Sequence, residues 1–382
     1  MNDTQQGPKS RAVIFSTPAL WRHGFGGKHP LKPERLARTV ALLEAYSALD
    51  VDNVRRLAPP IATDEQVGLV HTQGYIDAVR TLSEGRRLGV SSSTYGLGVG
   101  DNPIYRGMDE AARLKVGAGL AAARMLLDGE CDVAFNFAGG LHHALASRAS
   151  GFCIYNDPAV AIQWLVDQDL RVVYIDIDAH HGDGVQYAFE DTDRVLTISL
   201  HQDGRTLFPG TGFVEETGVG AGAGYTANIP LYPETDDETY LWAFSEIVPP
   251  LVRRFAPDVL VTQLGVDTHY LDPLTHLSLT THGHLALFEA LAELSPGKWL
   301  ACGGGGYNLD VVPRSWTLAF GVMSGQTFPD PLPEAYLDKW GDSRGSRTLH
   351  DSVAPKLSEA RQSRIRQHTE NMVAEVKRVH GL

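Results

Sequence analysis

The sequence predicts an α/β protein with a three-layer αβα architecture around a mainly parallel central sheet. Two observations predict this fold. Short β-branched runs alternate with longer helical patterns along most of the 382 residues, which is typical of βα units that build a parallel sheet with helices on both faces. Hydrophobic residues make up 43% of the chain, enough to fill a large core between such layers.

Six short apolar runs are the predicted strands. They cover 12–16, 132–137, 171–178, 194–200, 257–265 and 298–302. The helical patterns lie at 33–47, 109–128, 157–168, 237–254, 282–294 and 355–379. In the first of these, Leu36, Val40 and Leu43 recur at helical spacing. Pro33, just before them, suits the first turn of a helix.

No linker or internal repeat divides the chain, so we expect one domain at 12–382 behind a flexible N-terminal tail at 1–11. The region 86–107 is rich in Gly and Ser and is predicted to be a long surface loop. Loops of that length are usually functional or disordered.

Composition argues against several classes of protein. No apolar run approaches the roughly 18 residues of a membrane helix, and the polar N-terminus lacks a secretory signal, so we expect a cytoplasmic protein. The formal net charge of −13 argues against a nucleic-acid partner and favours a cationic one, such as a lysine-bearing peptide or a polyamine. The widely spaced Cys131, Cys153 and Cys302 fit buried free thiols.

The stretch Asp176-Ile-Asp-Ala-His-His-Gly-Asp-Gly184 places three carboxylates and two imidazoles at the end of a predicted buried strand. In an extended chain, Asp176, Asp178 and His180 project to one side. Carboxylate and imidazole groups at this spacing suit a divalent ion such as zinc, whose catalytic sites usually have three protein ligands. A polar loop that only caps the strand is the alternative, but five buried ionisable groups would be costly unless paired or metal-bound.

Polar clusters follow the carboxyl ends of five predicted strands, where open parallel sheets bind ligands. They contain His142 with His143, the Asp176 stretch, Ser199 with His201, Asp267, and Gly303-Gly-Gly-Gly-Tyr307. Asp267 is a candidate third metal ligand, although by itself it is as suited to capping a helix. The adjacent histidines favour acid–base chemistry, because nearby carboxylates can fix their tautomers.

The four glycines before Tyr307 could cradle a phosphate, but they lack the Gly-Lys-Ser/Thr ending of that motif. We expect them instead to bring the backbone close to the site. They would then present the Tyr307 hydroxyl to a developing oxyanion.

Five stretches, in order, resemble the signatures of zinc-dependent histone deacetylases. They are Gly139-Gly-Leu-His-His143, Gly151-Phe-Cys-Ile-Tyr-Asn-Asp157, Asp176 to Gly184, Phe208-Pro-Gly-Thr-Gly212 and Gly303-Gly-Gly-Gly-Tyr-Asn308. Within that superfamily the chain is most similar to bacterial acetoin utilisation proteins. The stretches that carry this similarity are His29-Pro-Leu-Lys-Pro-Glu-Arg35, Leu271-Asp-Pro-Leu-Thr-His276 and Val312-Pro-Arg-Ser-Trp316.

The resemblance implies an arginase-like fold and zinc-dependent hydrolysis of N-acetyl-lysine in proteins to lysine and acetate. The implied zinc ligands are Asp178, His180 and Asp267. The implied catalytic residues are His142, His143, Asp176, Asp183 and Tyr307. The implied substrate-binding residues are Asp101, Gly151, Phe152, Phe208 and Leu274.

The resemblance also assigns individual roles. Asp176 would orient His142, Asp183 would orient His143, and Tyr307 would polarise the acyl carbonyl. The substrate would be held by the Gly151 carbonyl at its amide hydrogen, by a tunnel of Phe152 and Phe208 around the lysine stem, and by Asp101 at the rim.

The family also binds potassium, so the resemblance implies K⁺ in addition to zinc. One potassium site would involve Asp176, Asp178, His180, Ser199 and Leu200. A second would involve Phe189, Thr192, Val195 and Tyr225. Several of these residues would coordinate through the main chain.

Three other functions compete with protein deacetylation. The main alternative is an amidohydrolase acting on small acetylated amines such as acetylpolyamines, which the apolar Leu274 disfavours because a rim carboxylate would suit those substrates better. A second alternative is an arginase-type enzyme with two manganese ions, but such a site would require a second carboxylate at the position of His269. A non-catalytic acyl-lysine reader would not need the catalytic groups. The physiological substrate, the preferred acyl group, the metal in the cell and the oligomeric state stay open.

Overall fold

A computed structural model describes residues 10–98, 100–341 and 345–382. Its strands are β1 (Ala12–Phe15), β2 (Val54–Leu57), β3 (Val133–Asn136), β4 (Val172–Asp176), β5 (Val195–Gln202), β6 (Thr226–Leu231), β7 (Val259–Gln263) and β8 (Trp299–Cys302). They form one eight-stranded sheet in the order β2-β1-β3-β8-β7-β4-β5-β6, and all neighbouring pairs are parallel. The predicted parallel sheet is confirmed.

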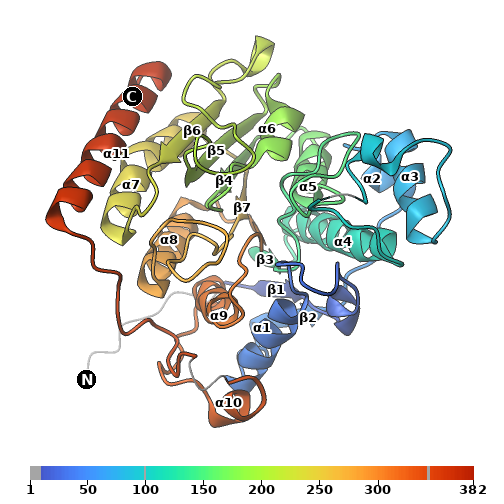
Figure 1. Ribbon diagram of the computed structural model, residues 1–382, viewed down its shortest axis with the longest axis horizontal. Coiled ribbons are helices and arrows are strands. Elements are labelled where there is room, and N and C mark those ends of the chain that lie inside the picture. Colours follow the sequence, from blue (N-terminus) through green and yellow to red (C-terminus); the bar gives the residue numbers. More distant parts are fainter. Residues whose placement is uncertain (1–9, 99, 342–344) are drawn as a thin grey trace.

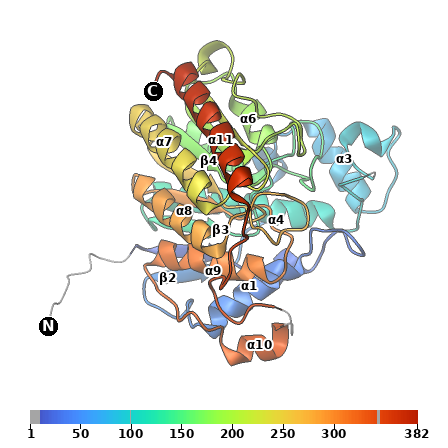
Figure 2. The ribbon, with the colours of Figure 1, turned by 60° about the vertical axis from the view of Figure 1, so that its left-hand side comes forward.

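Helices cover both faces of this sheet (Figure 1). They are α1 (Glu34–Ala45), α2 (Asp64–Val67), α3 (Gln73–Ser83), α4 (Met108–Leu127), α5 (Asp157–Val166), α6 (Asp183–Phe189), α7 (Asp237–Phe255), α8 (Thr281–Leu294), α9 (Val311–Ser324), α10 (Glu334–Trp340) and α11 (Glu359–His380). One core contains α1, α7, α8 and α9, and a second contains α4, α5 and α6. This arrangement confirms the three-layer class. The last helix, α11, lies alongside α7 (Figure 2).

The central strands are buried on both faces, which explains their continuous apolar sequences. In β4, Val173 and Ile175 belong to the core with α7 and α8, whereas Val172 and Tyr174 belong to the core with α4 and α5. Successive side chains of a strand point to opposite faces, so a strand between two helical layers needs apolar residues at every position.

The six predicted strands correspond to β1, β3, β4, β5, β7 and β8. The prediction missed β2 and β6, which lie at the two edges of the sheet. The β2 sequence is Val-Arg-Arg-Leu, and β6 contains Pro230, so neither has the apolar run of a central strand. The two arginines of β2 are exposed, and an edge strand such as β6 can include a proline because one side of its backbone has no strand to pair with.

The six predicted helices correspond to α1, α4, α5, α7, α8 and α11. The prediction missed α2, α3, α6, α9 and α10. In the predicted surface loop between α3 and α4, the described residues contain one short 3₁₀ helix, Ser92–Tyr95.

The strand β4 ends at Asp176, earlier than predicted, so the expected alternation through His180 is wrong. The chain turns after Asp176, and the main-chain N–H of Asp178 donates to Asp176 Oδ1 at 3.1 Å. The helix α6 then begins at Asp183, inside the stretch predicted to be a polar strand end. This turn, rather than an extended strand, places the polar side chains.

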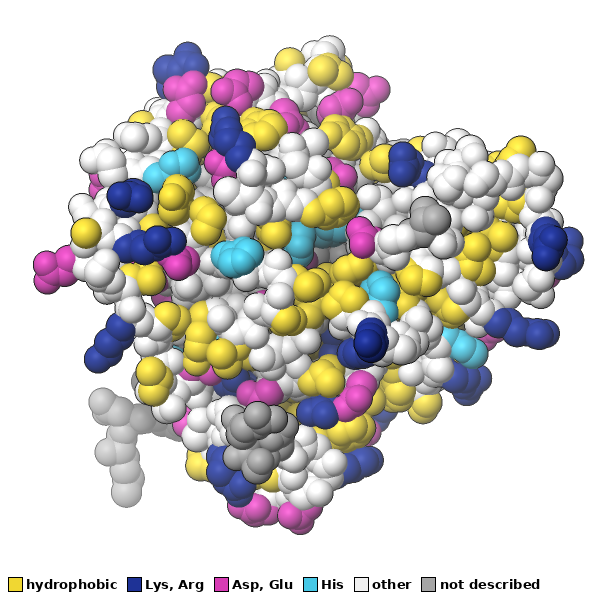
Figure 3. Space-filling view, viewed as in Figure 1, with side chains coloured by type: hydrophobic (Ala, Val, Ile, Leu, Met, Phe, Trp, Pro, Cys, Tyr) yellow, Lys and Arg dark blue, Asp and Glu magenta, His cyan; other side chains and the backbone are white. Residues whose placement is uncertain are grey.

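Residues 1–9 of the predicted tail lie outside the described residues, so the tail and the single-domain boundaries stay predictions. Arg11 pairs with the half-exposed Asp132 at 2.7 Å, immediately before β1. Within the described ranges, no helix combines the length and apolarity needed to cross a membrane. On the face in Figure 3, Lys and Arg side chains are scattered among acidic and neutral ones, which gives no support for nucleic-acid binding there.

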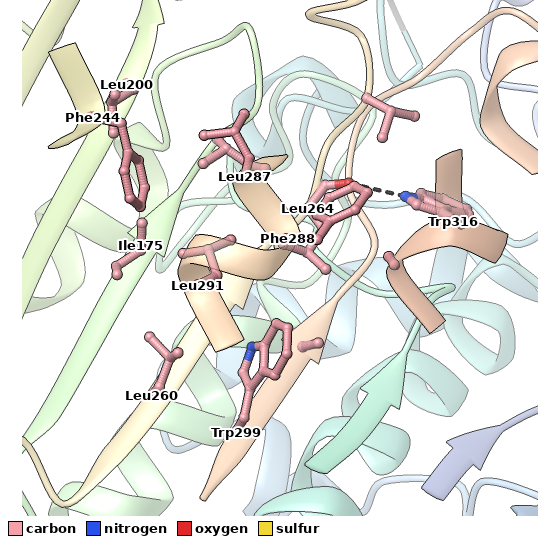
Figure 4. Packing of buried hydrophobic residues seen from close by; sticks show 14 of the residues in the cluster. Ile175, Leu200, Phe244, Leu260, Leu264, Leu287, Phe288, Leu291, Trp299 and Trp316 are labelled. Atoms are coloured by element: carbon pink, nitrogen blue, oxygen red, sulfur yellow. Dashed lines mark hydrogen bonds between the residues drawn. The ribbon is translucent and has the colours of Figure 1, made fainter. Parts of the chain in front are cut away.

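The core connects the helical layer to the functional end of the sheet. Phe288 and Leu291 of α8 belong to the core between this helix and the sheet (Figure 4). The buried Trp316 of α9 donates its indole N–H to the carbonyl of Leu264 at 2.9 Å, just after β7. The segment between β7 and Asp267 is therefore held by a buried hydrogen bond as well as by packing.

A buried ionic network joins the C-terminal part of the chain to the same region. Asp351 accepts from Arg314 Nη1 at 2.9 Å and lies 2.7 Å from His269 Nε2. It also accepts from the main-chain N–H of Thr281 at 2.8 Å. Burial alone would raise the pKa of Asp351, but His269 and Arg314 hold it well below its usual value.

We predict that Asp351→Ala lowers the free energy of unfolding at pH 7 by about 3–5 kcal/mol, because it removes one of the two carboxylates that pair with the buried Arg314 and leaves the buried His269 without its carboxylate partner. The contribution of a carboxyl whose pKa is lowered by folding is present above its unfolded pKa, about 4, and is lost as the pH falls through the folded value. Urea unfolding of both proteins should therefore show a difference that shrinks in acid. Glu334→Ala, which breaks only the exposed pair with Arg347, should change little.

Candidate active site

The polar clusters lie at one edge of the sheet, after five strands that are neighbours in it. These strands, β3, β8, β7, β4 and β5, stand consecutively in the strand order. Because all are parallel, their carboxyl ends open on the same edge, and the residues that follow them converge. Ser199 and His201 lie among the last residues of β5, because this strand runs to Gln202 rather than to residue 200.

Asp178, His180 and Asp267 form the central group of this edge. One ligand atom from each lies within 4.8 Å of the others, and all three residues are buried. His180 Nδ1 is 3.0 Å from Asp178 Oδ1 and 3.0 Å from Asp267 Oδ2. Two oxygens and one imidazole nitrogen at these distances form a donor set suited to a divalent cation.

Neighbouring N–H groups fix the orientation of the two carboxylates. Asp178 Oδ2 accepts from Gln263 Nε2 at 2.6 Å and from the main chain of Gly305 at 2.7 Å. Asp267 Oδ1 accepts from the main chain of Ala179 at 2.8 Å. These bonds occupy Asp178 Oδ2 and Asp267 Oδ1, so Asp178 Oδ1 and Asp267 Oδ2 are the atoms that face His180.

The charges of this group favour a bound cation. Burial and the neighbouring Asp178 raise the pKa of Asp267 to about 6. Burial opposes a charge on His180, yet the two carboxylates raise its pKa to about 10. The cluster thus holds a proton tightly on the imidazole, and a divalent ion would take the place of that proton and satisfy all three ligand atoms. The residues therefore fit a metal site.

His142 and His143 lie beside this cluster with ring centroids 4.0 Å apart. Asp176 Oδ2 lies 2.7 Å from His142 Nδ1 and accepts from the Tyr174 hydroxyl at 2.6 Å. Burial would lower the pKa of His142, but Asp176 and Asp178 raise it to about 9. His142 is therefore positively charged near neutral pH.

His143 has the opposite electrostatic character. Its Nδ1 lies 2.7 Å from Asp183 Oδ1, which also accepts from the main chain of Gly184 at 2.9 Å. Burial and the charge of His142 lower the pKa of His143 to about 4. The ring is neutral at pH 7, its Nδ1 donates to Asp183, and its Nε2 is left as an acceptor.

Gly151 allows the wall of the cavity to approach the histidines. A Cβ atom at this position would lie 2.3 Å from His143 Cδ2 and 2.9 Å from Phe208 Cε1, and the backbone φ is +49°. Only glycine fits here. The Phe208 ring packs edge-on against His143 at 5.1 Å, and Phe152 packs edge-on against Tyr307 at 5.7 Å.

Tyr307 reaches the site from the glycine-rich segment after β8. A Cβ at Gly305 would lie 2.1 Å from Asp267 Oδ2, so a residue without a side chain is needed for the backbone to pass the candidate metal ligands. The main chain of Tyr307 donates to Asp272 Oδ2 at 2.8 Å. Burial raises the pKa of the Tyr307 phenol well above its usual value, so its hydroxyl keeps its proton. Burial and Asp267 raise the pKa of Asp272 to about 8, although two main-chain N–H donors oppose that rise.

These side chains line one small cavity of about 20 Å³. Its predicted members are His142, His143, Gly151, Phe152, Asp178 and Tyr307. The predicted rim residues lie further out: Phe208 is 43% exposed, Leu274 is half-buried, and Asp101 is exposed. The Asp101 carbonyl lies 3.1 Å from His29 Nε2, and the His29 ring packs on Phe152 at 4.6 Å.

The residues of the first predicted potassium site lie at the adjoining ends of β4 and β5, where Asp176 is in register with Ser199. The second set surrounds the end of α6 and the starts of β5 and β6. In that set Phe189 ends α6, Val195 begins β5, and Tyr225 directly precedes β6. Both potassium sites stay predictions.

Sequence reasoning missed four residues that support the site. They are Gln263, Asp272, Tyr174 and Arg35. Arg35 is buried and donates to the carbonyls of Gly304 at 2.7 Å and Gly306 at 3.0 Å. Arg35 and Asp272 lie inside stretches that carried the family resemblance, but only their three-dimensional contacts reveal what they hold.

Comparisons with known proteins agree with this geometry. The histone deacetylase domain family matches residues 29–323. Acetoin utilization protein AcuC of Bacillus subtilis (strain 168) is 42% identical over 339 residues, which cover 86% of each chain. The protein of the same name from Staphylococcus xylosus is 41% identical over 331 residues, covering 84% of this chain and 85% of that one. The predicted resemblance is confirmed.

Solved structures support the same fold. An HDAC homolog from Aquifex aeolicus has a TM-score of 0.87 at 32% identity, covering 96% of this chain and 100% of that chain. An HDAC homolog complexed with SAHA has a TM-score of 0.86 at 32% identity, covering 97% and 100%. The predicted deacetylase-like αβα fold is confirmed.

We predict that the protein binds one divalent ion per chain and that Asp267→Ala removes it, because that substitution deletes one of three converging ligands. Metal analysis after loading and dialysis measures the occupancy. Asp237→Asn changes a half-buried carboxylate, one that holds Thr280 at the start of α8, and should retain the ion. Full occupancy in Asp267→Ala would contradict the ligand assignment.

Proposed function

Because the chain belongs to the histone deacetylase family, we propose that this deacetylase uses zinc to hydrolyse N-acetyl-lysine in proteins to lysine and acetate. The observation that carries the proposal is the single cavity in which the ligand Asp178, the histidine pair and Tyr307 meet. Such a cavity offers a metal site, a general base and a hydroxyl donor to one amide bond.

Asp178, His180 and Asp267 would hold the ion. Zinc suits their mixture of nitrogen and oxygen donors, and three protein ligands leave a position for water or substrate. When bound, it would polarise the acyl carbonyl and lower the pKa of water toward about 7.

His143 is the proposed general base. Its ring is neutral, and its Nδ1–H donates to Asp183. The unprotonated Nε2 can therefore accept a proton from the attacking water. As the carbonyl carbon gains a bond to the water oxygen and loses its bond to nitrogen, the same imidazole delivers that proton to the departing lysine amine. General acid–base catalysis of this kind contributes roughly 10²–10⁴ in rate.

The oxyanion would be stabilised from two sides. The Tyr307 hydroxyl keeps its proton and can donate it as a hydrogen bond to the carbonyl oxygen. His142, held by Asp176, would place a positive charge close to the reacting amide, because the carboxylates of Asp176 and Asp178 raise its pKa.

The substrate would enter between aromatic side chains. Phe152 and Phe208 would pack against the apolar stem of the lysine, with the Gly151 carbonyl accepting the amide hydrogen. Asp101 would hold the peptide backbone at the rim. Because Leu274 is apolar, the rim lacks a carboxylate at this position to select a second cationic group, which favours protein lysine over acetylpolyamines.

The proposal includes two further points, which concern bound potassium and the location of the protein in the cell. Potassium ions would bind at the ends of β4 and β5 and at the turn between α6 and β5. The protein would act in the cytoplasm, on acetylated proteins rather than on nucleic acid or a membrane.

We predict that the purified protein releases acetate from an acetyl-lysine peptide, loses this activity on chelation and regains it with zinc. Acetylspermidine, assayed in parallel, should be a poorer substrate. Turnover of acetylspermidine alone would favour the small-amine alternative. No turnover of either substrate with the metal bound would point to another acyl group or to an acyl-lysine reader.

We predict that Tyr307→Phe lowers kcat by roughly 10²–10³ while the metal stays bound, because it removes one hydrogen-bond donor from the oxyanion. Steady-state kinetics and metal analysis measure the two effects separately. Tyr46→Phe is the matched control, since the Tyr46 hydroxyl only bonds to the carbonyls of Pro329 and Pro331. An unchanged rate in Tyr307→Phe would remove this residue from the mechanism.

A further inference from the structure

Asp272 is a buried carboxyl group that stands between two exposed residues of the rim segment. The segment from Asp267 to His276 has no helix or strand, and the neighbours of Asp272, Leu271 and Pro273, are exposed. Asp272 itself is only 8% exposed. Burying a carboxylate is costly unless its oxygens are hydrogen-bonded, so its partners indicate its purpose.

Both oxygens of Asp272 accept main-chain N–H groups. Oδ1 accepts from Leu274 at 2.9 Å, and Oδ2 accepts from Tyr307 at 2.8 Å. The first bond shapes the rim segment, and the second joins that segment to the one after β8. A parallel cross-link runs from Asn308 Nδ2 to the carbonyl of Leu271 at 3.0 Å.

The course of the segment that carries Tyr307 is fixed by hydrogen bonds to its main chain. Four consecutive glycines precede Tyr307, and Gly304 and Gly306 adopt φ values of +126° and +133°. Glycine has the greatest conformational freedom of any residue, so the path of this segment depends on bonds to its main chain. Gly305 is anchored to Asp178, and Arg35 holds the carbonyls on either side of it.

Asp272 supplies the anchor at Tyr307 itself. It also belongs to the segment that begins with the metal ligand Asp267, whose carbonyl accepts from the Thr275 hydroxyl. The bond from Tyr307 to Asp272 therefore ties the hydroxyl-bearing residue to the segment that carries a metal ligand.

We propose that Asp272 is a positioning residue that sets the place of the Tyr307 hydroxyl relative to the metal site through the main-chain N–H of Tyr307. This inference rests on the proposed function, in which Tyr307 donates to the acyl carbonyl. It adds a residue that touches neither substrate nor metal but controls one that does. A misplacement of about 1 Å at a catalytic group can cost on the order of 10²-fold in rate.

A double-mutant cycle tests the proposal. Asp272→Ala should lower kcat by roughly 10–100-fold with little change in KM and with the metal retained. In a Tyr307→Phe background the same substitution should cost less than about 2-fold, because the hydroxyl that it misplaces is already gone. Equal losses in both backgrounds would mean that Asp272 has only a general structural role.

Two more variants sharpen the test. Asp272→Asn keeps one carbonyl acceptor and should lose less activity than Asp272→Ala, and it serves as the test protein if the alanine variant does not fold. Asp237→Asn alters a half-buried carboxylate outside the cavity and should keep the wild-type kcat. Loss of metal from Asp272→Asn would overturn the proposal, since the residue would then act on the metal segment.

The outcome is separable from that of the proposed function. Wild-type turnover of the acetyl-lysine peptide tests the proposed function alone, and the cycle can be run on acetylspermidine if only that amine is hydrolysed. Hydrogen exchange at the Tyr307 amide gives a readout without any substrate. The exchange rate of this amide should increase in Asp272→Ala but not in Asp237→Asn. An unchanged rate in Asp272→Ala would contradict the hydrogen bond from the Tyr307 N–H to Asp272.

Discussion

Two buried carboxylates that face one imidazole nitrogen form the constraint on which the functional end of this protein depends. Asp178 and Asp267 repel each other in a region from which water is excluded, and their separation is fixed by bonds from Gln263, Gly305 and Ala179. Such an arrangement is unfavourable unless a positive charge lies between the carboxylates. The fold therefore favours a positive charge at this point, and the three ligand atoms are placed to accept a divalent cation.

The parallel sheet explains why this site can be assembled from distant parts of the chain. Five adjacent strands end at the same edge, so each short segment beyond a strand adds one chemical function. The two histidines differ in charge. Neighbouring carboxylates raise the pKa of His142 and favour its protonated form, whereas burial and the charge of His142 lower the pKa of His143 and favour its neutral form. One imidazole can thus stabilise negative charge while its neighbour accepts a proton.

The sequence was sufficient to predict the layers, the central strands and the residues at the strand ends, because continuous apolar runs and clustered ionisable groups are local signals. It could not reveal contacts between segments far apart in the chain. Gln263 looks like an ordinary strand residue until its amide meets Asp178. Edge strands such as β2 lack the apolar pattern, and α6 begins within the polar stretch, so neither gave a clear signal.

In the proposed mechanism, one metal ion held by Asp178, His180 and Asp267 drives amide hydrolysis. The most direct measurement titrates metal-depleted protein with zinc and records acetate release from an acetyl-lysine peptide together with bound zinc. We expect a rate that rises in proportion to occupancy and levels off at one ion per chain. A substantial rate before zinc is added, or no rate at full occupancy, would contradict it.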